Sequence, residues 1–204
     1  MSGTKERILA EALLLFSLEG YEAVSVSDIA GALGMTKAAL YKHYRSKRDI
    51  FDSILRRMEE RDAEQARRYE LPEGTAEEMP SAYGASGLSQ IAAFGKAMFR
   101  YWTEDEFACR FRRMLTLEQF RDREMGALYG QYLVSGPLGY LTDLFAALSL
   151  PEPEKKAASF YAPMFFLYSL WDGAEDKGAA PALLDSLLDD IRETILKEGE
   201  THGE

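Results

Sequence analysis

Basic and aromatic side chains are concentrated in one short segment near the amino end of the chain, where they provide the chemistry for holding a polyanion. This segment carries Lys37, Lys42, Arg45, Lys47 and Arg48, with Tyr41, His43 and Tyr44 between them. No Asp or Glu lies between Asp28 and Asp49. Lysine and arginine neutralise the phosphates of nucleic acid and release its counterions. The segment is therefore a candidate nucleic-acid contact.

Two short helices are expected to position these side chains. Ser25 can cap the first helix, and Asp28, three residues on, completes a capping-box pair. Gly34 is expected to end this helix, and Thr36 to cap a second one that runs to about Tyr44. A tight turn between two short helices, with cations on the second, is typical of a helix–turn–helix that lays its second helix against a duplex.

The start of the second helix offers several kinds of contact. Thr36 and Lys37 lie where free backbone N–H groups and a partial positive charge meet phosphate. The alternative for Thr36 is capping alone. Small residues follow at Ala38 and Ala39, which allow close approach to the major groove and contact with a thymine methyl, although both also simply favour a helix. Lys42 and His43 are expected to reach phosphates or base edges, and a purely structural histidine is the alternative.

Charge is distributed unevenly along the 204 residues, whose net charge is -10. Residues 1–50 hold seven Lys and Arg against six Asp and Glu, so their net charge is +1 and residues 51–204 carry -11. The acidic part should repel nucleic acid, which leaves the amino-terminal end to approach it. Ordinary surface charge is the alternative explanation.

Composition and helical spacing predict an all-α protein with a sizeable core, since 47% of the residues are hydrophobic and apolar residues recur at helical intervals. We expect a helix–turn–helix domain at 1–48, a connecting helix at 49–71, a loop at 72–87 and a helical domain at 88–204. The helices expected outside the basic segment are Thr4–Glu19, Leu88–Trp102, one from Thr103 past Leu115, Arg123–Leu148 with a bend at Gly136 and Pro137, Glu154–Trp171, and Pro181–Lys197.

Several features predict a soluble cytoplasmic protein without a membrane partner. The single cysteine, Cys109, forms no internal disulfide and fits a reducing compartment. The amino end lacks the pattern of a signal peptide. The longest apolar run, residues 161–171, is too short to cross a bilayer and contains Pro163.

The order of motifs resembles a known family. Residues 4–51, TKERILAEALLLFSLEGYEAVSVSDIAGALGMTKAALYKHYRSKRDIF, are similar to the N-terminal domain of TetR/AcrR-type transcriptional regulators. The resemblance implies a homodimer that binds a palindromic DNA operator, usually as a repressor, until a small-molecule effector enters the C-terminal domain. It also implies that Ser25, Tyr41 and Lys47 contact phosphate. The candidate DNA-binding residues are thus Ser25, Thr36, Lys37, Ala38, Ala39, Tyr41, Lys42, His43, Tyr44 and Lys47. The alternative for Tyr41 is buried packing, and Tyr44 is expected to be half-buried between helices with its hydroxyl near the backbone.

The C-terminal domain is expected to hold the effector and to dimerise. The segment LTLEQFRDREMGALYGQYLVSGPL resembles C-terminal domains of family members, and aromatic and methionine side chains there are candidates for a pocket, with core packing as the alternative. The pocket candidates are Met98, Tyr101, Trp102, Phe107, Phe111, Met114, Phe120, Tyr129 and Tyr132. The segment 161–171 is apolar nearly all round and must be buried, so a partner subunit is a natural cover; the alternative is a central place in a single bundle. The candidate interface residues are Tyr161, Phe165, Tyr168, Leu184, Leu188, Ile191 and Ile195.

Two other functions remain open at this level. A small helical enzyme is disfavoured because the chain holds only two histidines and one cysteine, which cannot assemble a Cys/His zinc site. We therefore expect no catalytic residue, no metal and no cofactor. A DNA-binding regulator that responds to a protein partner, or to no ligand, is the second alternative.

Overall fold

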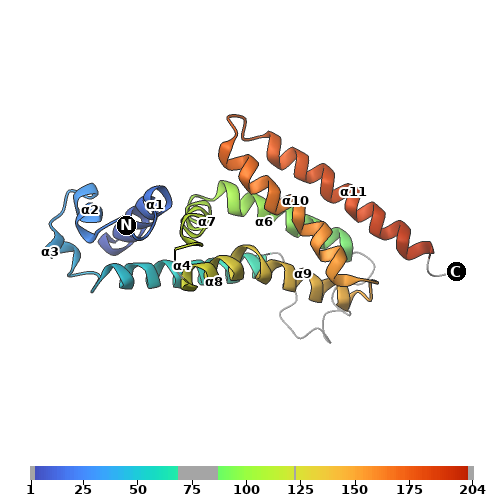
Figure 1. Cartoon of the computed structure of the whole chain (residues 1–204), viewed down its shortest axis with the longest axis horizontal. Helices are drawn as coiled ribbons and strands as arrows, with labels where there is room; N and C mark the ends of the chain where they lie inside the picture. The colour runs from blue at the N-terminus through green and yellow to red at the C-terminus, as the bar shows by residue number, and fades with distance from the viewer. Residues whose placement is uncertain (1–2, 69–86, 122, 202–204) are drawn as a thin grey trace. The chain divides into compact units, whose positions relative to one another are not determined.

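A computed structural model describes residues 3–68, 87–121 and 123–201, and every regular element in those ranges is a helix (Figure 1). The expected all-α fold is therefore confirmed. Residues 72–86 of the loop expected at 72–87 lie outside the described residues, and Gly87 is instead the first residue of a helix. Two compact units are present: Met1–Glu70 with Asp105–Tyr129, and Leu71–Glu104 with Gly130–Glu204.

The first unit is built around α1 (Thr4–Glu19), α2 (Val26–Ala32), α3 (Lys37–Leu40) and α4 (Lys47–Arg68). α1 packs against α2 and α4, and α2 packs against α3. One core joins these helices, because each places apolar side chains on its inner face: fully buried examples are Ile8, Phe16, Ile29, Leu40 and Ile54. This core fixes the turn between α2 and α3.

α7 (Glu106–Glu118) also belongs to the first unit and packs against α1. Asp105 caps α7 by accepting hydrogen bonds from the Phe107 and Ala108 amides, each at 3.0 Å. The same carboxylate pairs with Arg61 of α4 at 2.6 Å. The contacts thus group residues 105–129 with the amino-terminal helices, whereas the sequence placed them in the domain at 88–204.

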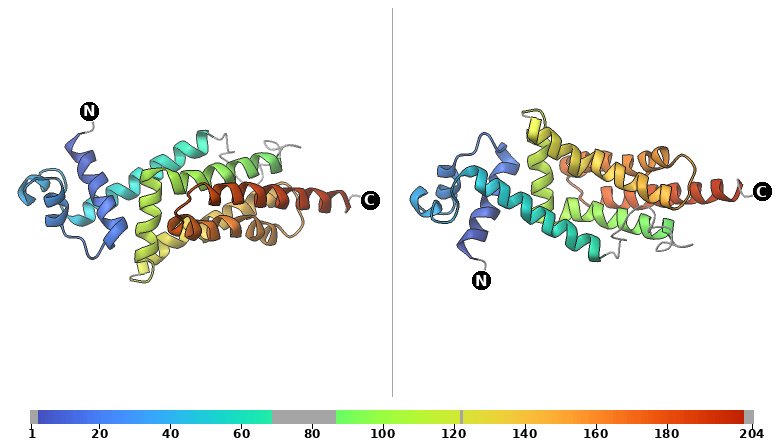
Figure 2. Two further views of the ribbon diagram at one scale, coloured as in Figure 1. Left: turned by 90° about the horizontal axis from the view of Figure 1, so that it is seen from above. Right: turned by 90° about the horizontal axis from the view of Figure 1, so that it is seen from below.

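The second unit is a helical bundle of α6 (Gly87–Glu104), α9 (Ser135–Ala147), α10 (Pro153–Gly173) and α11 (Ala179–Thr201). α10 packs against the other three, and α11 packs against α6, as both views of Figure 2 show. Two ion pairs join α6 to α11: Lys96 with Asp189 at 2.8 Å and Arg100 with Asp185 at 2.7 Å.

One long helix expected at 123–148 is two helices, α8 (Arg123–Leu133) and α9. The break falls at Val134, whose φ of -132° and ψ of -86° are not helical. Gly136 is needed just after it, because a Cβ there would overlap the carbonyl oxygen of Gln131. The expected bend at Gly136 and Pro137 is therefore a complete break two residues earlier.

No helix among the described residues combines the length and the apolar character needed to span a bilayer.

Candidate DNA-binding surface

The turn between α2 and α3 is formed by backbone hydrogen bonds around a glycine with positive φ. Gly34 has a φ of +64°, a conformation that other residues adopt only at a cost. Its amide donates to the carbonyl of Gly31 at 3.0 Å, and the Met35 amide donates to Ala30 at 2.9 Å. This turn brings α3 back across the end of α2.

Both predicted caps are present. The Asp28 amide donates to Ser25 Oγ at 3.2 Å, and the Ser25 amide donates to the Asp28 carboxylate at 2.7 Å, which forms the capping box. Hydrogen bonding to the Ser25 side chain and backbone lowers the pKa of the Asp28 carboxyl. At α3, the Ala39 amide donates to Thr36 Oγ1 at 3.1 Å. The capping expectations for Ser25 and Thr36 are therefore confirmed, and their phosphate contacts stay predictions.

α3 is shorter than expected. Its last residue is Leu40, and the chain continues to Tyr44 in a tighter turn, in which the Lys42 amide donates to Ala39 at 3.2 Å and the His43 amide to Leu40 at 2.9 Å. The side chains of this turn face solvent: Tyr41 is 45% exposed, and Lys42 and His43 are exposed as well. The structure thus presents a basic turn after α3.

At the start of α3, Lys37 and Ala38 are exposed, and Ala39 is half-buried. The ammonium of Lys37 lies 5.9 Å from the centre of the Tyr41 ring, close enough for a cation–π contact. We call the exposed residues between Lys37 and His43 the basic face: Lys37, Ala38, Tyr41, Lys42 and His43.

Tyr44 does not belong to this face: its side chain is buried and its hydroxyl reaches the backbone, as expected for this residue, so its place among the DNA-contacting side chains is corrected. The side chain is 2% exposed, and its hydroxyl donates to the carbonyl of Lys5 at 3.1 Å. Burial raises the pKa of the Tyr44 hydroxyl to about 12. Tyr44 therefore joins the turn after α3 to the first turn of α1 and holds the basic face in place.

Lys47 also makes contacts within the protein. Its ammonium donates to the carbonyls of Tyr21 at 2.8 Å and Glu22 at 3.4 Å, and lies 4.3 Å from the centre of the Tyr21 ring. Lys47 thus ties the start of α4 to the segment between α1 and α2. A phosphate contact by Lys47 stays a prediction.

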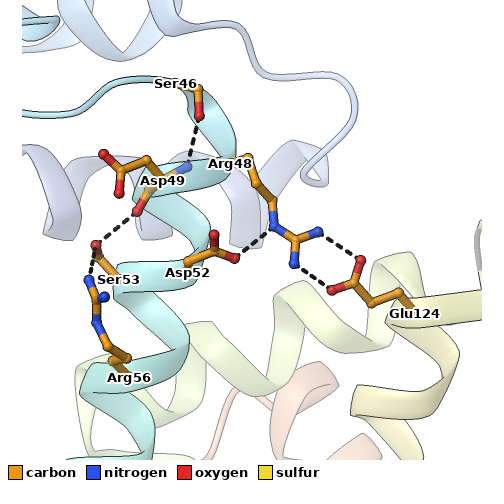
Figure 3. Close-up of polar contacts among 7 residues, drawn as sticks. All are labelled: Ser46, Arg48, Asp49, Asp52, Ser53, Arg56 and Glu124. Carbon is orange, nitrogen blue, oxygen red and sulfur yellow. Dashed lines mark hydrogen bonds and ion pairs between the residues drawn. The ribbon is translucent and has the colours of Figure 1, made fainter.

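The first turns of α4 hold a polar cluster that the sequence did not single out (Figure 3). Arg48 Nη1 and Nη2 donate to the two carboxylate oxygens of Glu124 at 2.7 and 2.6 Å, and Arg48 Nε donates to Asp52 at 2.7 Å. These bonds raise the pKa of the Arg48 guanidinium and lower that of the Glu124 carboxyl. Asp52 is visible from sequence as an i, i+4 partner, but Glu124 lies 76 residues away in the first turn of α8.

The predicted effector residues are divided between the two units. Phe107, Phe111, Met114, Phe120 and Tyr129 belong to the first unit, and Met98, Tyr101, Trp102 and Tyr132 to the second.

Phe120 is wrong as a lining residue, because it lies in the turn after α7 and is 91% exposed. Phe111 and Met114 are fully buried core residues. A hollow of about 410 Å³ does occur in the first unit, between α1 and α4, where Lys5, Glu6, Arg56 and Arg57 line it. The other pocket assignments stay predictions.

Most of the predicted interface residues face the interior of the second unit. Five of them are buried within the single chain, as the alternative of a single bundle expects, and their part in a dimer interface stays a prediction: Tyr161, Tyr168, Leu184, Leu188 and Ile195. Ile191 is half-buried, and Phe165 is exposed. The large apolar side chains that α10 and α11 do expose are Phe165, Phe166, Leu170, Leu183 and Leu196. We call these five residues the apolar face.

In the described part of the chain, no three His, Cys, Asp or Glu side chains are grouped so that they would hold a metal ion.

Comparison with known proteins agrees with the geometry of the first unit. Residues 8–54 match the family model described as "Bacterial regulatory proteins, tetR family". The HTH-type transcriptional regulator AcrR of Shigella flexneri is 43% identical over 51 residues, which is 25% of this chain and 24% of AcrR. The negative transcriptional regulator IcaR of the biofilm operon icaADBC in Staphylococcus aureus (strain Newman) is 36% identical over 52 residues, 26% of this chain and 28% of IcaR. The chain thus spans about a quarter of the length of these curated relatives.

Solved structures extend the likeness in fold to nearly the whole chain. A TetR-family transcriptional regulator from Bordetella parapertussis 12822 superposes with a TM-score of 0.64 at 18% identity, covering 94% of this chain and 95% of that one. A complex of SmeT with triclosan superposes with a TM-score of 0.60 at 16% identity, covering 92% and 90%. SmeT is the repressor of the Stenotrophomonas maltophilia multidrug efflux pump SmeDEF. Residues 8–54 are thus similar to the DNA-binding domain of the TetR family of bacterial regulatory proteins, and the chain as a whole shares its fold with solved structures of such regulators.

Proposed function

We propose that this chain is a homodimeric transcriptional repressor that binds a palindromic operator in double-stranded DNA and releases it when a small-molecule effector binds. The observation that carries the proposal is the basic face, which is exposed at the position where a helix–turn–helix meets the major groove. In the proposal, residues 1–48 bind DNA, the helix at 49–71 connects, and residues 88–204 bind the effector and dimerise.

The basic face has the composition that DNA recognition requires. Lys37 and Lys42 can neutralise backbone phosphates, which supply most of the affinity and its dependence on salt. Ala38 is small and exposed, so it allows the backbone of α3 to approach base edges. Tyr41 and His43 add side-chain donors at the end of the same surface, and phosphate contacts of this kind fix the register of the protein on DNA.

Dimerisation is supported by the apolar face of α10 and α11. Phe166 is 64% exposed, and Phe165, Leu170 and Leu183 are each at least 40% exposed. Soluble monomers rarely expose large apolar patches, so these exposed apolar side chains of α10 and α11 are candidates for an interface. A two-fold pair of these faces would present two DNA-binding domains to two half-sites.

Repression and response to an effector are supported by the relatives. IcaR is named as a negative regulator and SmeT as a repressor, and SmeT has been solved with triclosan. The coupling needed between an effector site and a DNA site is only about 1–3 kcal/mol. α7 is positioned to take part, since it packs against α1 of the DNA-binding domain. Binding to chromosomal DNA implies a cytoplasmic location.

The test is a selection of genomic fragments from the source organism by the purified full-length chain. We expect recovered fragments to share a dyad-symmetric sequence and to bind at least about 10³-fold more tightly than a scrambled duplex. Recovery of unrelated fragments that bind no better than the scrambled duplex would contradict the proposal. A shift of the melting temperature by a compound that also releases DNA distinguishes an effector-responsive repressor from a regulator that responds to a protein.

A further inference from the structure

Arg48 differs from the other cations near the basic face in the partners it holds. Lys37, Lys42 and Arg45 form no ion pair with any residue that the structure describes. Arg48, the second residue of α4, is instead enclosed by two carboxylates, Asp52 on its own helix and Glu124 on α8 (Figure 3). One cation of the segment is therefore already neutralised by carboxylates of the protein itself.

The geometry of this pair is the geometry in which arginine holds phosphate. The two terminal nitrogens of Arg48 meet the two oxygens of Glu124 at 2.7 and 2.6 Å, a bidentate fork that a phosphate group forms equally well. Arg48 Nε is occupied by Asp52 at 2.7 Å. A guanidinium that is held in this way has no free pair of parallel N–H groups for a DNA phosphate.

The exposure and the position of Arg48 allow a DNA phosphate to compete with Glu124 for its guanidinium. Its side chain is 50% exposed and that of Glu124 is 48% exposed, so neither is fixed by burial. Arg48 directly follows Lys47 and lies three residues after Arg45, at the helix start that comes next after the basic face.

We infer that Glu124 limits the affinity of this protein for DNA by occupying Arg48 with a carboxylate in place of a backbone phosphate. The inference rests on the proposed DNA binding. It assigns a role to Glu124, a residue of α8 that lies outside the helix–turn–helix. In the parent protein Arg48 stays in the fork when DNA binds, and it adds no phosphate contact.

The direct test removes the carboxylate and measures DNA binding over a range of salt. Glu124→Gln keeps the size of the side chain and removes its charge, and Glu124→Ala removes both oxygens. The probe is a short fluorescein-labelled duplex of random sequence, and fluorescence anisotropy reports binding by the full chain. Both variants should bind more tightly than the parent. One additional phosphate contact steepens the plot of log K against log salt by about 0.9, so the gain should shrink by about 3.5-fold between 50 and 200 mM salt.

Glu106→Gln is the matched control. Glu106 pairs with Arg110 on α7 at 2.5 Å, in the same unit, and its removal changes the net charge by the same amount. It should leave the salt slope unchanged. The double variant Arg48→Ala/Glu124→Gln should return to the slope of the parent, because the gain passes through Arg48. Thermal melts should show that all variants remain folded, since exposed ion pairs contribute little to stability.

Two results would overturn the inference. One is an unchanged salt slope in both Glu124 variants, and the other is an equal gain in Glu106→Gln, which would indicate a general effect of charge. Lys37→Ala separates the inference from the proposed function. If Lys37→Ala flattens the slope while the Glu124 variants do nothing, the inference alone fails. If the parent chain binds no duplex, the proposed function fails and the inference fails with it.

Discussion

The helix–turn–helix of the first unit and the α10–α11 pair of the second unit expose opposite kinds of surface. The basic face presents Lys37, Tyr41 and Lys42 to solvent above an apolar core that is sealed by Leu40 and Tyr44. The pair α10 and α11 has apolar side chains both inside the bundle, such as Leu188, and exposed to solvent, such as Phe166. A polar binding face can be distinguished from a core by residue type, whereas an apolar binding face cannot.

The largest effect is expected from a charge on the apolar face. Phe166→Glu should shift the monomer–dimer equilibrium by on the order of 100-fold or more, since a buried carboxylate replaces an aromatic anchor. Sedimentation velocity over a dilution series measures it. Phe120→Glu is the control, because Phe120 is more exposed but lies outside the apolar face. Equal association of Phe166→Glu and the parent would remove Phe166 from the interface.

Substitutions of the two tyrosines in the turn after α3 should affect different properties, stability for Tyr44 and DNA binding for Tyr41. Tyr44→Ala should lower the free energy of unfolding by about 3–5 kcal/mol, because it removes a fully buried ring. Tyr41→Ala should cost less than about 1 kcal/mol of stability, since the side chain is exposed, and should weaken DNA binding. Urea denaturation and anisotropy measure the two quantities. Similar losses of stability in both variants would contradict the distinction between core and basic face.

Lys37 should contribute one phosphate contact. Lys37→Ala should weaken binding to all duplex sequences alike and flatten the salt slope by about 0.9, which amounts to one counterion. Anisotropy titrations with the recovered operator and with a scrambled duplex provide the measurement. Loss of affinity for the operator alone would assign Lys37 to base recognition rather than to phosphate.

The smallest effect is expected at the cap of α2. Ser25→Ala removes the acceptor of the Asp28 amide and should cost about 1 kcal/mol of stability. Ser25→Asn, which can also cap, should recover most of this loss. A chemical denaturation curve that places Ser25→Ala level with the parent would mean that the capping box is not needed to stabilise the turn.

Acidification should act on the same cap. The pKa of the Asp28 carboxyl is lower in the folded protein, so its stabilising contribution is complete above the pKa of the unfolded chain and is lost as pH falls through the folded value. Asp28→Asn should therefore show a smaller decrease in stability than the parent as the solution is acidified. Parallel stability curves for the two proteins would contradict this linkage.

Features that depend on neighbours in sequence were predictable. Ser25 and Asp28 are three residues apart, and the turn at Gly34 follows from one residue with positive φ, so the positions of α1, α2 and the start of α3 follow from local chemistry. The early end of α3 was not predictable in the same way. It accompanies a bond from Tyr44 to Lys5, which is 39 residues away.

Features that depend on distant partners were missed. The fork between Arg48 and Glu124 joins residues 76 positions apart, so the sequence alone shows them only as two separate charged residues. The interface was assigned to Tyr161 and Leu188 because both are apolar at helical spacing. The structure packs both of them inside the bundle, and it exposes Phe165, which was among the predicted interface residues, and Phe166, which was not.

Hydroxyl-radical footprinting of the recovered operator tests the central claim most directly, that two copies of the basic face read a two-fold site. We predict two protected half-sites on one face of the duplex, with centres about one helical turn or somewhat more apart, and loss of both in Lys37→Ala. A single protected segment without dyad symmetry, or protection that is unchanged in Lys37→Ala, would contradict the account.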